Sequence, residues 1–483
     1  MSHQDTKSTE PIVINHETIR KAISALFPAR IFQGLEVHKG AKWTPRMLVA
    51  VALIWVWSRA EALTDRFEEA RKVVNKMFRG LPDVGATYNG FMKQLHKWHV
   101  ELQVLCIGEL RVLMKQDLLG QWEMHGFVVI AGDGSRIELP RTQANEAAYS
   151  PQSKKKRSGT RGKGKAKHTG KKSRRRMRRQ SPESITKKTN SPQMWLTLLW
   201  HVGTGLPWAW RTGPSDSSER QHLEEMLSEL PENTLIAADA GFVGYEFLSA
   251  VHAAGHSFVI RAGANVRLLK KLGYAREYGH IVYLWPNGAA KKNMPPLVLR
   301  VVWVHDGKQP MCLLTNVLSK SRLSDRQVAQ IYQARWGVEV FFRTFKRTFH
   351  RHKLRSRTPK HAKLEAEWSL VGLWAVCLLA QREIAQSGGD PCRLSPAGAI
   401  KAFQQVVCHY RVRPKCRQES LWWMLRHALQ DDYERTSDKT ARAYPRKNQR
   451  KRTGVPTIIN ALAPQVTAAK QLKQKRAEIR LTA

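Results

Sequence analysis

Cysteine is scarce in this sequence: 483 residues contain six, all widely separated. None forms a C-x-x-C pair, so we expect neither a zinc site nor a framework of disulfide bonds. This usage is typical of a protein from a reducing compartment such as the cytoplasm.

Long apolar runs are also missing. The longest, at 47–57 and 368–380, are shorter than the roughly 18–20 residues that a membrane-spanning helix needs. We expect both to be buried core helices. The first residues, MSHQDTKSTEP, are polar and have no apolar signal-peptide core. The sequence therefore predicts no membrane partner.

Acidic residues are few beside basic ones: 39 Asp and Glu face 81 Lys and Arg, a net charge of +42. Such a surplus favours binding to a polyanion, most commonly nucleic acid. The run 154–179 holds 15 Lys and Arg and no acid. A mobile DNA-contacting loop is the favoured interpretation, beside a solvated loop and a targeting-like run. Most cations lie outside it, which predicts an extended phosphate-binding surface.

The first part of the chain is expected to be helical. Between residues 15 and 120, apolar residues recur at helical spacing, with polar or Gly/Pro breaks between the segments. We expect a helical N-terminal domain at 1–122. Its many basic residues make it a candidate for binding DNA ends, although a helical bundle with a charged face explains the pattern nearly as well.

From Gly126 the pattern changes to short buried strands. The apolar run 127–131 ends at Gly132-Asp133-Gly134, and the run 234–238 ends at Asp239-Ala240-Gly241. Strands and helices then alternate, which predicts an α/β sheet in which two strands deliver carboxylates at their ends. The remaining boundaries are expected as follows: a core at 123–263 and 319–360, a basic loop inserted at 141–190, a β insertion at 264–318, a helical C-terminal region at 361–435, and a basic, partly disordered tail at 436–483.

A long helix is expected from about 324 to 351. At about 100° per residue, Tyr332, Arg335, Glu339 and Lys346 fall within an arc of roughly 60°, beside an apolar stripe. A surface ladder of ion pairs would give the same row of charges and would contribute little stability. This helix alone does not decide between the two interpretations.

The spacing Tyr332-x2-Arg335-x3-Glu339-x6-Lys346 resembles the Y-R-E-K signature of transposases of the insertion-sequence-four family. The segments beginning at Gly132 and Asp239 resemble that family's two aspartate motifs, in the same order. An Asp beside Gly is by itself more often a turn residue than a ligand. Three ordered matches over about 126–351 are a much stronger signal. The resemblance implies a ribonuclease H-like core with a β insertion before the glutamate helix.

The resemblance further implies a three-carboxylate (D-D-E) site made of Asp133, Asp239 and Glu339. These carboxylates would hold two Mg²⁺ or Mn²⁺ ions, since hard oxygen ligands suit both metals. We expect the three acids to converge within coordination reach of the ion pair. Two such ions can stabilise both the attacking and the leaving oxygen when a phosphodiester is cut or joined.

Other residues are expected to touch DNA. By the same resemblance, Tyr332, Arg335 and Lys346 would contact phosphates near the cut, with Arg343 a weaker candidate just off their face. Hairpin formation at an element end needs a flipped base, and a tryptophan of the β insertion would suit it as a stacking platform. Trp285 and Trp303 are the candidates, although core packing explains most tryptophans.

The implied partners are double-stranded DNA, as terminal inverted repeats and as target, and a second copy of the chain in a homodimer. The implied location is the bacterial cytoplasm, at the nucleoid. Two alternatives stay open: a ribonuclease H-like nuclease that cuts without joining, and a non-catalytic or domesticated DNA-binding protein derived from a transposase.

Overall fold

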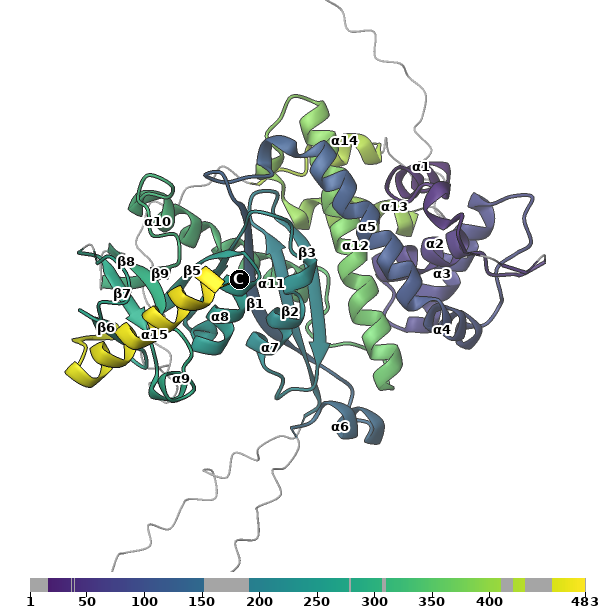
Figure 1. Ribbon diagram of the computed structural model, residues 1–483. Coiled ribbons are helices and arrows are strands. Elements are labelled where there is room, and N and C mark those ends of the chain that lie inside the picture. The colour runs from purple at the N-terminus through teal and green to yellow at the C-terminus, as the bar shows by residue number, and fades with distance from the viewer. Residues whose placement is uncertain are drawn as a thin grey trace, which may run out of the picture.

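The computed structural model is a mixed α/β protein with one large sheet and many helices (Figure 1). It describes residues 16–35, 37–38, 40–151, 191–277, 279–305, 310–409, 420–430 and 454–482. The basic run 154–179 lies outside these ranges, so its expected role as a DNA-contacting loop stays a prediction.

Ten strands form the sheet in the order β10-β6-β7-β8-β9-β5-β4-β1-β2-β3. β1 is central to the half that carries the acidic motifs: it pairs with β2 antiparallel and with β4 parallel. The bounds are β1 Val128–Glu138, β2 Gln193–His201, β3 Leu206–Gly213, β4 Thr234–Ala238, β5 Ser257–Ala262, β6 Arg267–Lys270, β7 Ile281–Leu284, β8 Leu297–His305, β9 Pro310–Thr315 and β10 Thr457–Asn460.

The helices expected between residues 15 and 120 are present. Their apolar faces pack together; α2, for example, is buried along almost its whole length. Whether they form a separate DNA-end-binding domain stays a prediction. The bounds are α1 His16–Leu26, α2 Pro45–Trp57, α3 Leu63–Met77, α4 Tyr88–Lys97 and α5 His99–Asp117.

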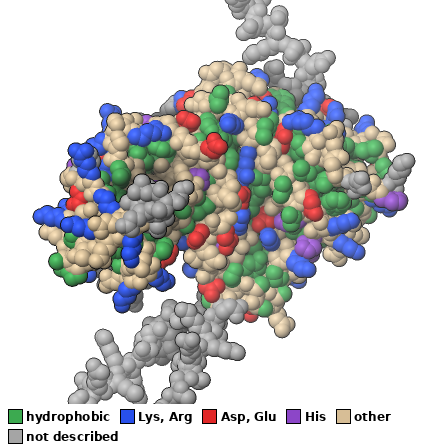
Figure 2. Space-filling model, viewed as in Figure 1, with side chains coloured by type: hydrophobic (Ala, Val, Ile, Leu, Met, Phe, Trp, Pro, Cys, Tyr) green, Lys and Arg blue, Asp and Glu red, His purple; other side chains and the backbone are tan. Residues whose placement is uncertain are grey.

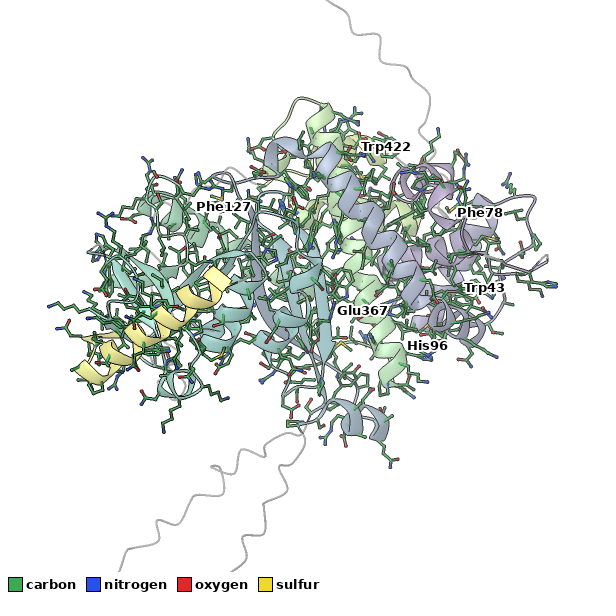
Figure 3. All side chains as sticks on the ribbon, viewed as in Figure 1. Trp43, Phe78, His96, Phe127, Glu367 and Trp422 are labelled. Atoms are coloured by element: carbon green, nitrogen blue, oxygen red, sulfur yellow. The ribbon has the colours of Figure 1, made fainter. Side chains whose placement is uncertain are left out.

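The long helix α12 (Pro359–Gln386) lies between these helices and the sheet, in contact with α2, α5 and β3 (Figure 1). It is long and apolar enough to cross a membrane, but its whole apolar window is buried inside the protein. α12 is therefore a core helix, as expected for 368–380. Its Glu367, labelled in Figure 3, accepts a hydrogen bond at 2.6 Å from the buried His99 of α5.

The segment 264–318 is β-rich as expected, but it is not a separate module. Its last strand, β9, pairs antiparallel with β5, so the added strands continue the same sheet. The apolar side chains of Cys312, Leu313 and Leu314 on β9 are buried against this junction. Burying them offsets the cost of ordering the extra strands.

Part of the expected basic tail, residues 454–482, is ordered. β10 pairs parallel with β6, and α15 (Ala463–Thr482) follows it. The apolar pair Ile458 and Ile459 aligns with Leu268 and Leu269 of β6. Part of the expected basic loop, 143–149, is also ordered, as α6.

Among the remaining helices, α7, α8, α10 and α11 contact strands of the sheet, and α13 and α14 pack against α12. Their bounds are α6 Gln143–Tyr149, α7 Glu219–Glu225, α8 Tyr245–Ala253, α9 Asn287–Lys291, α10 Asp325–Ala334, α11 Trp336–Arg343, α13 Pro396–His409 and α14 Leu421–Arg426.

Candidate active site

Two aspartates lie side by side on neighbouring strands of the sheet. The parallel register of β1 and β4 pairs Ala131 with Ala237. Continued two residues past its last pair, this register would bring Asp133 opposite Asp239, and adjacent strands are about 4.8 Å apart. Asp133 is in the middle of β1, so the strand does not end at this acid as expected, whereas Asp239 is the first residue after β4. The two acids are close enough for the charge of Asp239 to act on Asp133.

Asp239 is held by its own turn. Its Oδ1 accepts a hydrogen bond of 2.8 Å from the backbone N–H of Gly241, which caps a single helical turn, Ala240–Phe242. Phe242 is fully buried and anchors the turn in the core. The hydrogen bond and the anchor together fix where the carboxylate stands relative to β4.

The glutamate of the expected motif comes from α11, which packs against β1. Arg335 Nη2 donates to Glu339 Oε1 at 3.2 Å. The Arg335 side chain is 10% exposed and that of Glu339 35%, so the pair is only partly open to solvent. Glu339 lies within electrostatic reach of Asp133.

The helix expected at 324–351 is not continuous. α10 ends at Ala334, Arg335 forms a turn, α11 follows, and residues Thr344–Thr348 form a π-helical turn. A β-carbon on Gly337 would overlap the ring of Trp200 of β2, so only glycine allows α11 to approach the sheet this closely. π-helical turns are frequent at functional sites, and this one carries Lys346.

A fourth carboxylate, which the sequence did not single out, lies beside the two aspartates. Glu219 begins α7, which contacts β1. A β-carbon built on Gly134 would lie 2.5 Å from Glu219 Oε1, and one on Gly241 would lie 3.8 Å from Glu219 Oε2. Glu219 therefore reaches toward both aspartate motifs. An acid in the first turn of a helix is ordinarily explained by the helix dipole. Only the packing of α7 against β1 and the turn after β4 brings Glu219 to the aspartates.

The proximity of these acids affects their pKa values. Burial raises the pKa of Asp133 to about 6, and the charges of Asp239 and Glu339 act in the same direction. Burial likewise raises the pKa of Glu219 to about 7, reinforced by Asp133 and Asp239. Buried like charges that repel one another favour protonation of some members, and a cation bound among them would relieve the repulsion.

The carboxylates of the site are not arranged to coordinate a metal ion together. Among the residues that the structure describes, no three His, Cys, Asp or Glu side chains are arranged to hold a metal ion together. The expectation of three acids within coordination reach is therefore not met in this conformation. The physical reason is that Glu339 is drawn to Arg335, while the acids repel one another.

The other residues expected to contact DNA lie at different positions around the site. Lys346 Nζ donates to Ser135 Oγ at 2.6 Å, two residues beyond Asp133, and burial lowers its pKa. Tyr332 is buried under the guanidinium of Arg335, 5.3 Å from its ring centre. Arg343 is exposed and lines a different cavity, of about 700 Å³, with Trp200.

The two tryptophans named as stacking candidates differ. Trp285 is buried, and its indole N–H donates to the carbonyl of Met294 at 2.8 Å, so core packing accounts for it. Trp303 is 42% exposed on β8 and remains available. Trp336 is 58% exposed and begins α11, three residues before Glu339. Its position beside the motif was a signal that the sequence already contained.

Residues 125–375 match the model of the family described as "Transposase DDE domain". Asp133, Glu219, Asp239 and Glu339 all lie inside that range. Over 195 residues the chain is 28% identical to the transposase InsG for insertion sequence element IS4 of Escherichia coli K12. That similarity covers 39% of this chain and spans 42% of the relative's length, so the chain matches less than half of that protein.

A comparison with solved structures returns a cryo-EM structure of the piggyBac transposase synaptic complex with hairpin DNA. It covers 92% of this chain and 90% of that chain, with a TM-score of 0.37 and 10% sequence identity.

Proposed function

This chain belongs to the transposase DDE domain family, and we propose that it is the transposase of an insertion sequence, which cuts the element ends and joins them to target DNA. Asp133, Asp239 and Glu339 would be its catalytic acids, with Mg²⁺ or Mn²⁺ as cofactor. The chain would act on double-stranded DNA in the bacterial cytoplasm, at the nucleoid.

The observation that carries the proposal is the meeting of the three motifs. The register of β1 and β4, continued two residues past its last pair, supports a position of Asp133 opposite Asp239, and α11 packs against β1 with Glu339 near enough to act on the charge of Asp133. Asp133 and Glu339 are more than 200 positions apart in the sequence, so their proximity comes from the fold. A row of surface ion pairs gives no reason for this arrangement.

A ribonuclease H-like core is part of the proposal. On one side of β1, β2 pairs antiparallel with β1 and β3 pairs antiparallel with β2. On the other side, β4 pairs parallel with β1 and β5 pairs parallel with β4. An acid inside β1, a second acid directly after β4, and a glutamate on a helix that packs against β1 support that assignment. We propose the core boundaries as 123–263 and 319–360, with 264–318 as an extension of the same sheet.

The donor set fits a hard divalent ion. Asp133, Asp239, Glu339 and Glu219 offer only carboxylate oxygens, which Mg²⁺ and Mn²⁺ prefer. A pair of bound ions would stabilise charge on the attacking and leaving oxygens of the phosphodiester. For Glu339 to join such a set, its carboxylate must turn away from Arg335, which would leave the guanidinium free for a phosphate oxygen.

The basic side chains around the carboxylates would then contact different phosphates of the DNA. Lys346, tied to Ser135 beside Asp133, would hold a phosphate next to the reacting one, and Arg335 would clamp another. Buried Tyr332 would keep Arg335 in place, and Arg343 would contact DNA further out. Trp303 and Trp336 are exposed faces on which a displaced base could stack, whereas Trp285 is better explained by packing.

DNA-end recognition is proposed for the helices of 1–122, and a homodimer for holding two ends together. Lys and Arg side chains are spread over the visible face of the molecule, including the lobe of β6, β7 and α15 (Figure 2). Such spreading suits a long phosphate-contacting surface better than a single basic tail.

The test is a cleavage and strand-transfer assay with a labelled duplex carrying the inverted repeats that flank the gene, in Mg²⁺. We expect joined products from the wild type. Cut products alone would point to a nuclease, and a bound complex without cutting to a DNA-binding derivative. Asp239→Asn should bind the duplex normally while cleavage falls by about 10³-fold or more. Normal cutting by this variant would reject the assignment.

A further inference from the structure

A second concentration of charge lies away from the carboxylates. A cavity of about 480 Å³ opens where the segment 349–355, which follows the π-helical turn, meets the loop between α2 and α3. We call it the basic pocket. Its charged lining consists of Arg59, Arg66, Arg351, Lys353, Arg355 and a single acid, Glu61.

Arg351 at the floor of the pocket is buried without an acid partner. It is 2% exposed, and its guanidinium donates to three neutral oxygens: Ser369 Oγ, the Phe349 carbonyl and the Val56 carbonyl, at 2.7–2.8 Å. Among the described residues it forms no direct ion pair, and Glu365 is the acid whose charge acts on it from a distance. Its hydrogen bonds are satisfied, but its charge is only partly offset.

Arg66 is nearly as poorly compensated. It is 6% exposed and donates to the Ala60 carbonyl at 2.6 Å, while Glu365 stands 3.9 Å away, at the limit of an ion pair. Glu365 already accepts from the backbone of Arg355 and Ser356. One buried carboxylate therefore serves several guanidinium groups, and burying uncompensated charge is costly.

The rim is exposed and equally cationic. Arg59 donates to the neutral amide of Gln404 at 3.0 Å, and Lys353 and Arg355 are open to solvent. His350, which also lines the pocket, has a lowered pKa because of burial and the surrounding positive charges of Arg351, Arg59 and Arg66. The interior of the pocket is therefore strongly positive, and an anion would offset the cost of keeping it so.

The pocket is tied to the catalytic strand. The backbone N–H of Glu138, the last residue of β1, donates to the His352 carbonyl, and Leu354 N–H donates back to Glu138. Glu138 is five residues beyond Asp133, roughly 17 Å along an extended strand. With about 3.4 Å of DNA axis per nucleotide step, that span corresponds to about five steps.

We propose that the basic pocket binds a phosphodiester of the DNA strand, about five nucleotide steps from the phosphate that reacts. This inference rests on the proposed function for the identity of the DNA. Exposed Arg59 and Lys353 would take the outer phosphate oxygens, with the buried pair Arg66 and Arg351 supplying the positive floor beneath them.

The test measures binding of the same labelled end duplex over a range of salt concentrations. Arg59→Gln/Lys353→Gln should bind about tenfold weaker at 150 mM salt and lower the slope of log K against log salt by about one to two, because each lost phosphate contact removes about one released ion. Lys291→Gln/Lys292→Gln, at an exposed site on α9, removes the same charge and should change the slope much less. Equal effects in both pairs would overturn the proposal.

Neutral methylphosphonates placed singly along the duplex locate the contact. The wild type should lose affinity at a position four to six steps from the cut, and the Arg59→Gln/Lys353→Gln variant should be indifferent there. If inorganic phosphate alone raises the Tm of the wild type while no methylphosphonate position matters, the pocket takes a free anion and not DNA. Failure of the proposed function would appear separately, as a wild type that binds but does not cut.

Discussion

Lys346 Nζ donates a hydrogen bond of 2.6 Å to Ser135 Oγ, which joins the π-helical turn after α11 to the strand that carries Asp133. The two residues are 211 positions apart in the chain. This contact places a half-buried cation two residues from Asp133, and it links two motifs that are separate signals in the sequence.

We expect Lys346→Gln to slow single-turnover cleavage by about 10–100-fold, because a charge-assisted contact to the reacting strand is lost. Lys346→Arg should restore part of the rate. Ser135→Ala removes only the anchor and should cost less than Lys346→Gln. The idea is falsified if both substitutions leave the cleavage rate at its wild-type value while folding is unchanged.

The raised pKa of Asp133 predicts how stability depends on pH without divalent ions. Its folded pKa is about 6 against an ordinary 3.8, so the folded state keeps a proton that the unfolded chain releases. Stability should therefore fall as pH rises from about 4 to about 6. In EDTA, Asp133→Asn should be more stable than wild type by about 1–2 kcal/mol at pH 7, with the difference vanishing near pH 4. Urea unfolding at several pH values measures this, and a pH-independent difference would count against it.

Glu219 should contribute to holding a divalent ion. Glu219→Gln is expected to weaken Mn²⁺ binding, followed by calorimetry, and to lower cleavage by about tenfold or more, since one hard oxygen donor is lost. Glu224→Gln is the matched control, because Glu224 is an exposed acid on the same helix. Identical Mn²⁺ affinities for the two variants would exclude Glu219 from the site.

Gly337 should tolerate no side chain. Gly337→Ala forces a methyl group into the Trp200 ring, so we expect a loss of about 1–3 kcal/mol of stability and a larger loss of cleavage, as α11 carries Glu339 away from β1. Gly288→Ala in α9 meets nothing within 4 Å and should be neutral or slightly stabilising. Equal unfolding midpoints for these two variants would contradict the packing argument.

Local pattern was enough to find most elements near the site. The apolar run 234–238 is β4 with its expected bounds, because a short buried strand closed by Asp239 has few other interpretations. β1 begins where the apolar run predicts, but it continues to Glu138, past the acid at which it was expected to end. The signals for both strands lie within a few residues of the chain.

The features that could not be predicted from the sequence depend on contacts between residues that are far apart in the chain. β6 and β10 pair across nearly 190 residues, and neither segment is distinctive alone. The helix breaks at Arg335, and Gly337, two residues later, lies against Trp200 of β2. A helical wheel with a uniform 100° per residue shows neither feature. Glu219 joins the site only through the placement of α7 against β1 and the turn Ala240–Phe242 after β4, which no local spacing encodes.

The unbroken hydrogen-bonding from β5 to β9 has a mechanical consequence. The lobe built from 264–318 cannot swing about residue 263 as a hinged arm, because that motion would tear main-chain bonds inside the sheet. A displacement of this lobe would therefore change the twist of the neighbouring strands β5, β4 and β1, and with it the spacing of Asp133 and Asp239.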